Sequence, residues 1–585
     1  MEDNCLKVSR NTFLRIKMAK KNYSKLGREE LLKIVDKQDK ELATKKYGIV
    51  WDAEKEPEKV VQECADNLPI LKLVKDKEIK NSEEEDNILI EGDNYHALTV
   101  LNYTHKEKID VIYIDPPYNT GNKKEWKYND HWIDGEDGYK HSKWLNFMEK
   151  RLNLAKKLLK KTGVIFISID DHEVAQLKLL CDKVFGENNF IGNLIWESKL
   201  TGGHDSKHLN SIHEYVLCYA KDSQKENILN KRMSEKVYSN LDSENNLNFK
   251  WDSLWTVSHG YTKNCDYPIE SLDGTKIFPW MCHKDKEKVK GVARWFWNKE
   301  NYIENKNKLM IKKDKKGNWK VYKKVYSGTE IPYQTIFDKN IVGGTSHGKE
   351  TLSQIFGNIN VFDNPKPIQL IKEIIKIGEN KDSIILDFFA GSGTTAHAVL
   401  DLNKDGGKRK FILCTNNEDN NGDKKKICSD ICYPRIEKVM NGYKNSKGEN
   451  VAPLGGNLQY FQTALVKDSK NRDQIKINLT QECTEMLCVK ENIFNLKKES
   501  KDFKIFQSNK KGKFLCVYYN FFDKSFNEFL KELKATNGKK VVYMFSLENK
   551  VDKELFKGID NIKFEAIPQK ILEIYKQLIK LNIIK

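Results

Sequence analysis

Short apolar runs alternate with segments of helical periodicity in the first part of this chain. Apolar runs at Ile88–Ile90, Asp110–Ile114 and Val164–Ile169 predict buried strands. Apolar residues recur at helical spacing over Trp144–Lys161 and Val174–Val184, which predicts a helix on each side of the third strand. Strands that alternate with helices indicate a parallel sheet covered by helices, which is the α/β fold class.

The alternation stops near residue 200 and resumes near Phe362. The second set of predicted elements is a helix over Ile368–Ile377, strands at 384–386 and 411–414, and a helix after Gly393. The α/β domain is therefore expected in two halves with an insertion between them. Further strands near Phe514–Tyr519 and Val541–Phe545, with helices between and after them, predict a small α/β unit at the end.

These patterns divide the chain into five expected parts. They are a helical N-terminal extension (1–85), the first half of the α/β domain (86–200), the insertion (201–345), the second half of the α/β domain (346–450) and a C-terminal α/β domain (451–585). A chain of 585 residues is too long for one ordinary core, which agrees with several folding units.

Composition and charge narrow the class of protein. A hydrophobic fraction of 39% with 10% aromatic residues is sufficient for globular packing. The net charge of +17 suits a polyanionic partner, although the bias of an AT-rich genome explains it equally well.

The twelve cysteines form no paired CxxC zinc motif, so no metal is expected. No apolar run approaches the ~20 residues that span a bilayer, so we expect no membrane partner and a cytoplasmic location.

A short loop motif, Asp115-Pro116-Pro117-Tyr118, follows the second apolar run. The amine of a nucleobase is a poor nucleophile because its lone pair is delocalised into the ring. A carboxylate from Asp115 and the backbone carbonyl of Pro116 can accept its two N–H bonds and favour a more available lone pair. Two prolines make the turn rigid, and Tyr118 can stack on a base that has left its duplex. The alternative is an ordinary proline-rich turn.

A glycine-rich turn, Asp387 to Thr395, follows the strand at 384–386. Small residues at 390–393 allow a ligand to approach the backbone closely, and Asp387 can hold an ammonium group. Phosphate binding is the competing interpretation, but no basic residue lies between Asp387 and Val399. Asp93, in a turn after the first strand, is a weaker candidate for a cofactor contact, and a simple helix cap explains it equally well.

Three other features have less specific interpretations. The segment Gly343–Glu350 resembles a phosphate loop, but Glu350 stands where a magnesium-binding Ser or Thr is needed. The segment His213–Tyr219 is typical of a strand with ordinary core and surface positions. The insertion interleaves tryptophans with lysine clusters at 284–290 and 312–324, which predicts either nucleic-acid binding or a core filled by tryptophan with solvated lysines outside.

The motifs together resemble a known family. The chain is similar to adenine-N6 DNA methyltransferases of the circularly permuted class, and most of all to the modification subunits of type III restriction systems. The stretches that carry the resemblance are Asp115–Gly121, Gly163–Asp171, Phe362–Pro367, Asp387–Ala396 and Gly456–Phe461. The resemblance implies a Rossmann-like methyltransferase sheet and covers about 88–200 and 345–500.

The resemblance also implies a cofactor, a set of site residues and partners. It assigns Asp115, Pro116, Pro117 and Tyr118 to catalysis. It assigns S-adenosylmethionine to a site made by Asp387, Phe388, Ala390, Gly391, Ser392, Gly393 and Thr394, with Lys366 and Asp93 nearby. Many relatives place an acid for the cofactor ribose at the end of the strand 411–415, where this chain has Thr415-Asn416-Asn417-Glu418, so the role falls either to Glu418 or to none of these residues. It assigns 201–345 to target recognition in double-stranded DNA, and it suggests a homodimer and a separate restriction subunit.

Several alternatives to adenine methylation remain at this stage. Cytosine-N4 methylation uses the same chemistry on another amine. A catalytically silent DNA-specificity subunit is a second alternative, against which the intact motifs argue. Methylation of RNA or of a protein glutamine is a third, and Asp rather than Asn at 115 disfavours it.

Overall fold

The computed structural model describes most of the chain after residue 57. The described residues are 58–121, 127–128, 131–132, 140–199, 208–225, 231–232, 238–257, 260–327, 330–417, 425–467, 472–510, 512–520, 525–546 and 550–583, with Gly27, Leu32 and Val35 as isolated positions. Residues 53–585 form one compact unit, to which the following description applies.

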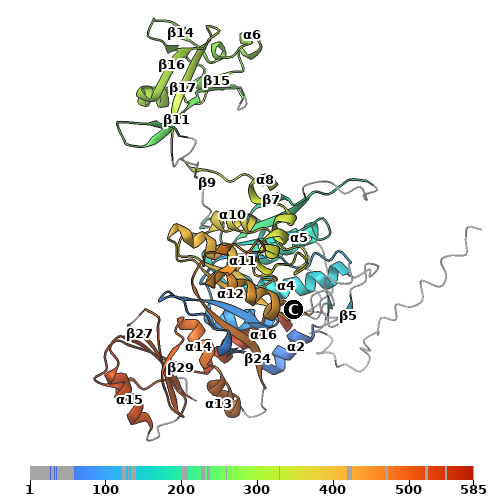
Figure 1. The fold of residues 1–585 in the computed structure, drawn as a ribbon, viewed down its shortest axis with the longest axis vertical. Helices are drawn as coiled ribbons and strands as arrows, with labels where there is room; N and C mark the ends of the chain where they lie inside the picture. The colour runs from blue at the N-terminus through green and yellow to red at the C-terminus, as the bar shows by residue number, and fades with distance from the viewer. Residues whose placement is uncertain are drawn as a thin grey trace, which may run out of the picture. The chain divides into compact units, whose positions relative to one another are not determined.

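A ten-stranded, mostly parallel sheet organises this unit (Figure 1). Its strands in spatial order are β1 (Asn67–Leu73), β24 (Asn457–Lys467), β2 (Asp86–Glu91), β21 (Lys410–Thr415), β20 (Ile384–Asp387), β3 (Ile109–Ile114), β6 (Leu159–Ile169), β8 (His213–Ala220), β7 (Phe190–Glu197) and β19 (Ile336–Phe337). The strands from β24 to β6 run parallel, whereas β1 and β8 run antiparallel to their neighbours.

Strands β3 and β20 lie side by side although their sequences are far apart. Ile385 pairs with Val111 and Leu386 pairs with Ile112 in parallel register. From β20 the sheet continues through β21, and from β3 it continues through β6 in the opposite direction. Such a reversal leaves a crevice at the carboxyl ends of the two strands, which is where open α/β sheets bind ligands.

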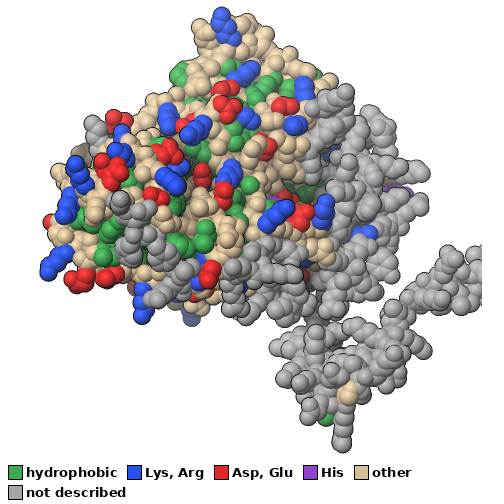
Figure 2. Space-filling view, turned by 90° about the horizontal axis from the view of Figure 1, so that it is seen from below, with side chains coloured by type: hydrophobic (Ala, Val, Ile, Leu, Met, Phe, Trp, Pro, Cys, Tyr) green, Lys and Arg blue, Asp and Glu red, His purple; other side chains and the backbone are tan. Residues whose placement is uncertain are grey.

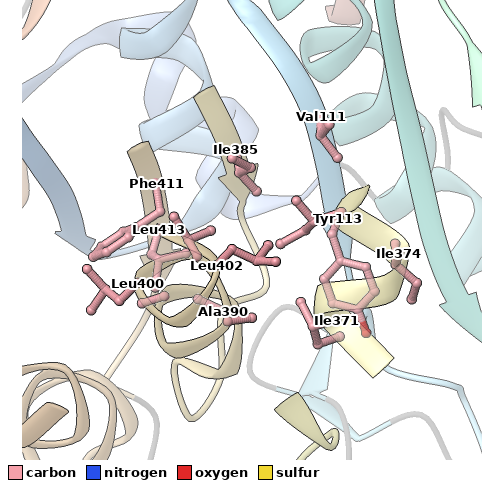
Figure 3. Close-up of a cluster of buried hydrophobic side chains, with 14 of the residues drawn as sticks. Val111, Tyr113, Ile371, Ile374, Ile385, Ala390, Leu400, Leu402, Phe411 and Leu413 are labelled. Atoms are coloured by element: carbon pink, nitrogen blue, oxygen red, sulfur yellow. The ribbon is translucent and has the colours of Figure 1, made fainter. Parts of the chain in front are cut away.

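Helices cover both faces of the sheet. One group comprises α3 (Asn94–Thr104), α4 (Lys140–Leu158) and α5 (Val174–Phe185), and the other comprises α8 (Lys339–Val342), α10 (Ile368–Gly378), α11 (Thr394–Leu402) and α12 (Tyr433–Asn441). Val111 and Tyr113 of β3 share a buried cluster with Ile371 and Ile374 of α10, as Figure 3 shows. Successive strand residues point to opposite faces, so the intervening Ile112 is buried on the other face.

The boundary between α4 and β6 differs from the sequence prediction. The predicted helix extends to Lys161, but α4 ends at Leu158 and β6 begins at Leu159. Leu159 pairs with Ile109 at the start of β3, so sheet pairing extends the strand back to this residue. Tertiary pairing therefore overrides the helical spacing of the leucines here.

Four strands of the main sheet, β1, β8, β19 and β24, lie in parts of the chain that we assigned elsewhere, with β19 at the end of the predicted insertion. Strand β1, and helix α2 (Lys59–Asp66) before it, belong to the predicted helical extension; β8 belongs to the predicted insertion, and β24 to the predicted C-terminal domain. Strands β1 and β8 are antiparallel, so they break the strand–helix alternation on which the division relied.

The insertion has a core of its own. Strands β10 (Asn240–Leu241), β11 (Asn248–Ser253), β17 (Trp319–Tyr326) and β16 (Leu309–Lys313) form a four-stranded sheet. Trp295 is fully buried in this core and donates its indole N–H to the carbonyl of Tyr267 at 2.8 Å. Trp255, Trp297 and Trp319 pack against the same core. These four tryptophans therefore fill a core, as the second interpretation of the insertion predicted.

The C-terminal segment contains a second sheet and several helices. Its strands in spatial order are β25 (Asn495–Glu499), β26 (Phe503–Gln507), β27 (Lys513–Tyr518), β28 (Lys539–Phe545) and β29 (Ile562–Ile567), and its helices are α13 (Arg472–Glu482), α14 (Thr484–Glu491), α15 (Ser525–Ala535) and α16 (Gln569–Ile583). The Tyr575 hydroxyl of α16 donates to the carbonyl of Pro69 in β1 at 2.6 Å. None of the described helices is both long and apolar enough to cross a bilayer.

Candidate active site

The turn after β3 carries the four predicted catalytic residues. Strand β3 is buried along its whole length, and Asp115 follows it immediately, at the carboxyl edge of the sheet. The Tyr118 hydroxyl donates to Oδ1 of Asp115 at 2.9 Å and lies 3.0 Å from Oε2 of Glu214. Burial and the charges of Asp115 and Glu214 raise the pKa of Tyr118 well above its usual value, so its hydroxyl keeps its proton.

Lys366 completes a cluster of charges around Asp115. Its Nζ lies 2.9 Å from Oδ2 of Asp115 and 3.4 Å from Oε2 of Glu214, and its side chain is 9% exposed. The ammonium group also lies 5.0 Å from the centre of the Tyr118 ring and 5.7 Å from that of Trp196. Burial lowers the pKa of Lys366, but the charges of Asp115 and Glu214 outweigh this effect and raise the pKa to about 12. The structure thus places Lys366 at the catalytic turn, and its predicted contact with the cofactor stays a prediction.

Neighbouring side chains fix the backbone of the catalytic turn. The indole N–H of Trp144 in α4 donates to the carbonyl of Pro117 at 2.8 Å. Asn119 has a left-handed backbone (φ 60°), and its side chain donates to Glu173 at 2.5 Å. The same oxygen of Glu173 lies 2.6 Å from Nδ1 of His141, and burial raises the pKa of Glu173. A turn held at both ends presents its carboxylate and carbonyl groups with little freedom.

The glycine-rich turn begins at Asp387, the last residue of β20. Oδ1 of Asp387 accepts from the backbone N–H of Phe389 at 3.0 Å, and Oδ2 accepts from the hydroxyl of Thr395 at 2.6 Å. Burial, with a contribution from the charge of Asp115, raises the pKa of Asp387 to about 7. Asp115 and Asp387 stand at the carboxyl ends of the neighbouring strands β3 and β20. Asp387 is 2% exposed and here stabilises its own turn, so its contact with a ligand ammonium stays a prediction.

The raised pKa of Asp387 predicts a pH-dependent loss of stability. Between its unfolded pKa of 3.8 and about 7, the folded chain holds a proton that the unfolded chain has lost, so folding stability falls as pH rises through this window. Asp387→Asn removes the charge and keeps one acceptor oxygen for the Phe389 N–H, while its amide NH2 can donate to the Thr395 hydroxyl, which can also accept. We expect the variant to gain up to about 4 kcal/mol over the unsubstituted chain between pH 4 and pH 8. Thermal unfolding at both pH values measures this, and an equal difference at the two pH values would contradict it.

The remainder of the turn leads into α11 with buried side chains and two left-handed glycines. Phe388, Ala390, Ser392 and Thr394 are each less than 9% exposed. Gly391 and Gly393 have φ values of 49° and 77°, a conformation that other residues rarely adopt. A Cβ on Gly391 would lie 3.2 Å from the ring of Phe362, and one on Gly393 would lie 3.1 Å from Sγ of Cys432. The turn therefore exposes backbone to a ligand in a space that side chains at Gly391 and Gly393 would fill.

A buried arginine supports this turn from α12. The Arg435 guanidinium donates to the carbonyl and hydroxyl of Ser392 at 3.3 and 3.1 Å and to the hydroxyl of Thr394 at 2.8 Å. Arg435 is 1% exposed, and burial lowers its pKa to about 10. The sequence disfavoured phosphate binding because the turn contains no basic residue, but the structure brings Arg435 to the turn from α12. The hydrogen bonds that Arg435 donates go to Ser392 and Thr394 of the turn itself. The turn therefore still suits a ligand that carries an ammonium group better than a phosphate.

Asp93 begins α3 as its N-cap and accepts from the N–H of Tyr95 at 2.7 Å, so the helix-cap interpretation accounts for its side chain. The adjacent Asn94 connects it to the cofactor turn, since the Asn94 amide donates to the carbonyl of Phe388 at 3.1 Å and accepts from Arg151 at 2.5 Å. Arg151 lies 3.6 Å from Asp93. Glu418, the predicted ribose ligand, lies outside the described residues.

The segment that resembles a phosphate loop has a packing role. Helix α9 (Thr345–Phe356) begins within it, and a Cβ on Gly348 would lie 1.9 Å from the carbonyl of Pro365. The glycine therefore lets α9 press against the chain that carries Lys366. No group of three or more potential metal-ligating side chains occurs among the described residues.

Comparison with known proteins agrees with this geometry. Residues 109–420 match the profile of a family described as DNA methylase (N6_N4_Mtase). The chain is 38% identical over 364 residues to the StyLTI Mod subunit, a type III restriction-modification enzyme of Salmonella typhimurium, with 58% of this chain and 53% of the relative covered. It is 32% identical over 488 residues to the EcoPI Mod subunit of Escherichia phage P1, with 73% of each chain covered. It is 35% identical over 382 residues to the type II methyltransferase M.KpnI of Klebsiella pneumoniae, with 62% and 89% covered.

The chain belongs to this DNA methylase family. The resemblance seen in its motifs is thereby confirmed, and two of these relatives are type III Mod subunits. The matched part corresponds to about half the length of the StyLTI subunit. The family profile ends near residue 420, so it includes both turns and the insertion between them.

Several residues of the methylase site were not predicted as site residues. Glu214, Trp144 and Arg435 are the clearest cases, and each contacts one of the two turns. Glu214 is a charged residue at the start of an apolar strand, and such a position is only weak evidence for a site residue. Trp144 fits the apolar spacing of its helix, and Arg435 looks like an ordinary charged surface position of a helix, so neither indicates a role in a site.

Proposed function

We propose that this methylase transfers the methyl group of S-adenosylmethionine to N6 of adenine at a specific site in double-stranded DNA. The observation that carries the proposal is the parallel pairing of β3 with β20. This pairing opens the Asp115 turn and the Asp387 turn at the same edge of one sheet. A donor held by one turn and an amine held by the other can therefore share one crevice.

The catalytic turn would orient the amine. Asp115 and the carbonyl of Pro116 would accept the two N–H bonds, while Trp144 holds the turn through the neighbouring Pro117 carbonyl. Tyr118 would stack on the adenine, which must first leave the duplex because its amine is otherwise paired. A carboxylate is a weak base, so we assign Asp115 a hydrogen-bonding role rather than full proton removal.

The glycine-rich turn and its neighbours would hold the cofactor. The group that S-adenosylmethionine supplies when bound is an electrophilic methyl carbon. Phe388, Ala390, Gly391 and Gly393 offer it backbone and small side chains at the end of β20. The Asn94–Phe388 hydrogen bond would keep the start of this turn in place.

We further propose that the insertion reads the DNA site and that exposed lysines on it contact phosphates. Lys284, Lys288 and Lys290 are exposed, whereas the side chain of Lys320 donates to the carbonyl of Cys282 at 2.7 Å. On the face seen in Figure 2, basic and acidic side chains are interspersed rather than gathered in one basic patch. This face therefore does not mark out a DNA-binding surface.

Replacing Lys284, Lys288 and Lys290 together by glutamine should weaken DNA binding and reduce its salt dependence. Each lost phosphate contact should lower the slope of log K against log salt by about 0.9, and so by about 2 to 3 in total. Fluorescence anisotropy with duplex DNA at several salt concentrations measures this slope. The matched control replaces Lys531, Lys534 and Lys539, which are exposed on the C-terminal segment. An unchanged slope would remove these lysines from the DNA interface.

The relatives also guide a proposal on assembly. StyLTI and EcoPI Mod are named as subunits of type III restriction-modification enzymes. We propose that this chain acts as the modification subunit of such a system, as a homodimer that associates with a separate restriction subunit. Size-exclusion chromatography with light scattering tests the dimer, and co-purification with a type III restriction subunit tests the partner.

The decisive experiment is direct analysis of methylated bases. Duplex DNA is incubated with the purified chain and S-adenosylmethionine, digested to nucleosides and examined by mass spectrometry, with RNA and protein as parallel acceptors. N6-methyladenine in DNA is the expected product. N4-methylcytosine alone would contradict the adenine assignment, and background transfer with every acceptor, restriction subunit included, would leave a silent specificity subunit.

A further inference from the structure

Glu214 occupies a position at the catalytic edge that the proposed roles above do not use. It is the second residue of β8, which runs antiparallel to β6 with Tyr215 paired to Ile169. The start of β8 therefore lies beside the carboxyl end of β6, at the same edge as Asp115. The Glu214 side chain is 18% exposed, so it is largely enclosed at this edge.

Both oxygens of Asp115 are already engaged by groups of the chain itself. Oδ1 accepts from the hydroxyl of Tyr118, and Oδ2 forms the ion pair with Lys366. A carboxylate in this state cannot receive a substrate N–H at full strength. Each oxygen keeps a second lone pair, but the charge of Lys366 weakens the carboxylate as an acceptor, so release of at least one partner strengthens the bond to the amine.

The released partners cannot be left without an acceptor. Lys366 is 9% exposed, and an ammonium that loses its ion partner in such a position is strongly disfavoured. Among the described residues, the carboxylates within 4.0 Å of its Nζ are Asp115 and Glu214. Glu214 is also within hydrogen-bond distance of the Tyr118 hydroxyl, at 3.0 Å. One carboxylate oxygen of Glu214 is thus in reach of both groups that Asp115 holds.

We propose that Glu214 is a positioning residue that takes over Lys366 and the Tyr118 hydroxyl when Asp115 binds the substrate amine. The inference rests on the proposed methyltransferase function. No covalent bond changes in this exchange, and Lys366 and Tyr118 keep their protons throughout. With Lys366 on Glu214, the Asp115 carboxylate faces the amine with an open acceptor site, and Tyr118 keeps a fixed ring orientation for stacking.

The Glu214→Gln variant tests the exchange because it preserves size and an acceptor oxygen but removes the charge. Lys366 then has Asp115 as its remaining anionic partner, which holds Asp115 away from the amine. We expect kcat to fall about 10–100-fold, while KM for DNA and the Kd for S-adenosylmethionine change less than about threefold. Glu197→Gln, the same change at the end of the adjacent strand β7, is the matched control and should retain normal kcat.

A double-mutant cycle with Lys366→Met separates this role from a purely structural one. If Glu214 acts by relieving Asp115 of Lys366, removing Lys366 makes Glu214 unnecessary. The Glu214→Gln/Lys366→Met double variant should then have the kcat of Lys366→Met alone, within about twofold, and a higher kcat than Glu214→Gln. The remaining charge is that of Asp115, whose side chain is 27% exposed and keeps the hydrogen bond from Tyr118, so this variant stays informative if Glu214→Gln alone is unstable in thermal unfolding.

The experiments separate failure of the Glu214 inference from failure of the proposed methyltransferase function. If the unsubstituted chain transfers no methyl group to any acceptor, the proposed function fails. If that chain is active and Glu214→Gln matches Glu197→Gln, the inference about Glu214 is wrong. Multiplicative losses in the double variant would equally overturn it, because they would show that Glu214 and Lys366 act independently.

Discussion

Asp115→Ala is expected to lower kcat for DNA methylation at least about 1000-fold, because it removes the carboxylate that would accept the amine N–H. Affinity for S-adenosylmethionine should change less than about threefold, since the cofactor turn keeps its own hydrogen bonds through Asp387. Loss of Asp115 leaves Lys366 with Glu214 as a partner 3.4 Å away, so the cluster keeps one ion pair. Single-turnover transfer of a labelled methyl group measures the chemical step directly.

The control for this prediction is a carboxylate at the opposite end of the same sheet. Asp382 is exposed in the turn before β20, and Asp382→Ala should retain normal turnover. Thermal unfolding of both variants shows whether a loss of activity reflects misfolding. Near-normal turnover of a folded Asp115→Ala protein would remove Asp115 from catalysis and with it the proposed role of the whole turn.

Gly391→Asp is expected to weaken S-adenosylmethionine binding at least about 100-fold. Gly391 has a φ of 49°, and any side chain there would press on the ring of Phe362 and fill the space in which the turn exposes its backbone. DNA binding should be preserved, because the insertion is remote in sequence and has its own core. Calorimetric titration with the cofactor and anisotropy with DNA separate these two effects.

Gly406→Asp provides a control with matched backbone strain. Gly406 has a φ of 81° after α11, and its Cβ position lies in open space. The same substitution there should cost about 1–2 kcal/mol of stability and leave cofactor affinity intact. Equal cofactor affinities in the two variants would show that the Asp387–Thr395 turn is not the cofactor site.

The local chemistry of both turns could be read directly from the sequence. Asp115-Pro116-Pro117-Tyr118 follows a fully apolar run, and the Asp387 turn follows another. Proline and glycine restrict or release the backbone by their own covalent structure, so their effect does not depend on distant residues. The strands β2, β3, β6, β20 and β21 were predictable for a similar reason, because buried strands of a parallel sheet are continuously apolar.

Only the tertiary structure decided which groups surround those turns. Glu214 and Arg435 come from β8 and α12, and nothing in their local sequence distinguishes them from surface or helix residues. The sequence pointed to Lys366, but only the structure places it against Asp115. Sheet pairing brings Glu214 to Asp115 across β6, and packing of α12 brings Arg435 beneath Ser392. Strands β1, β8, β19 and β24 join the main sheet for the same reason. The energy of a strand pair or an ion pair depends on residues that are hundreds of positions apart, and no local pattern contains that information.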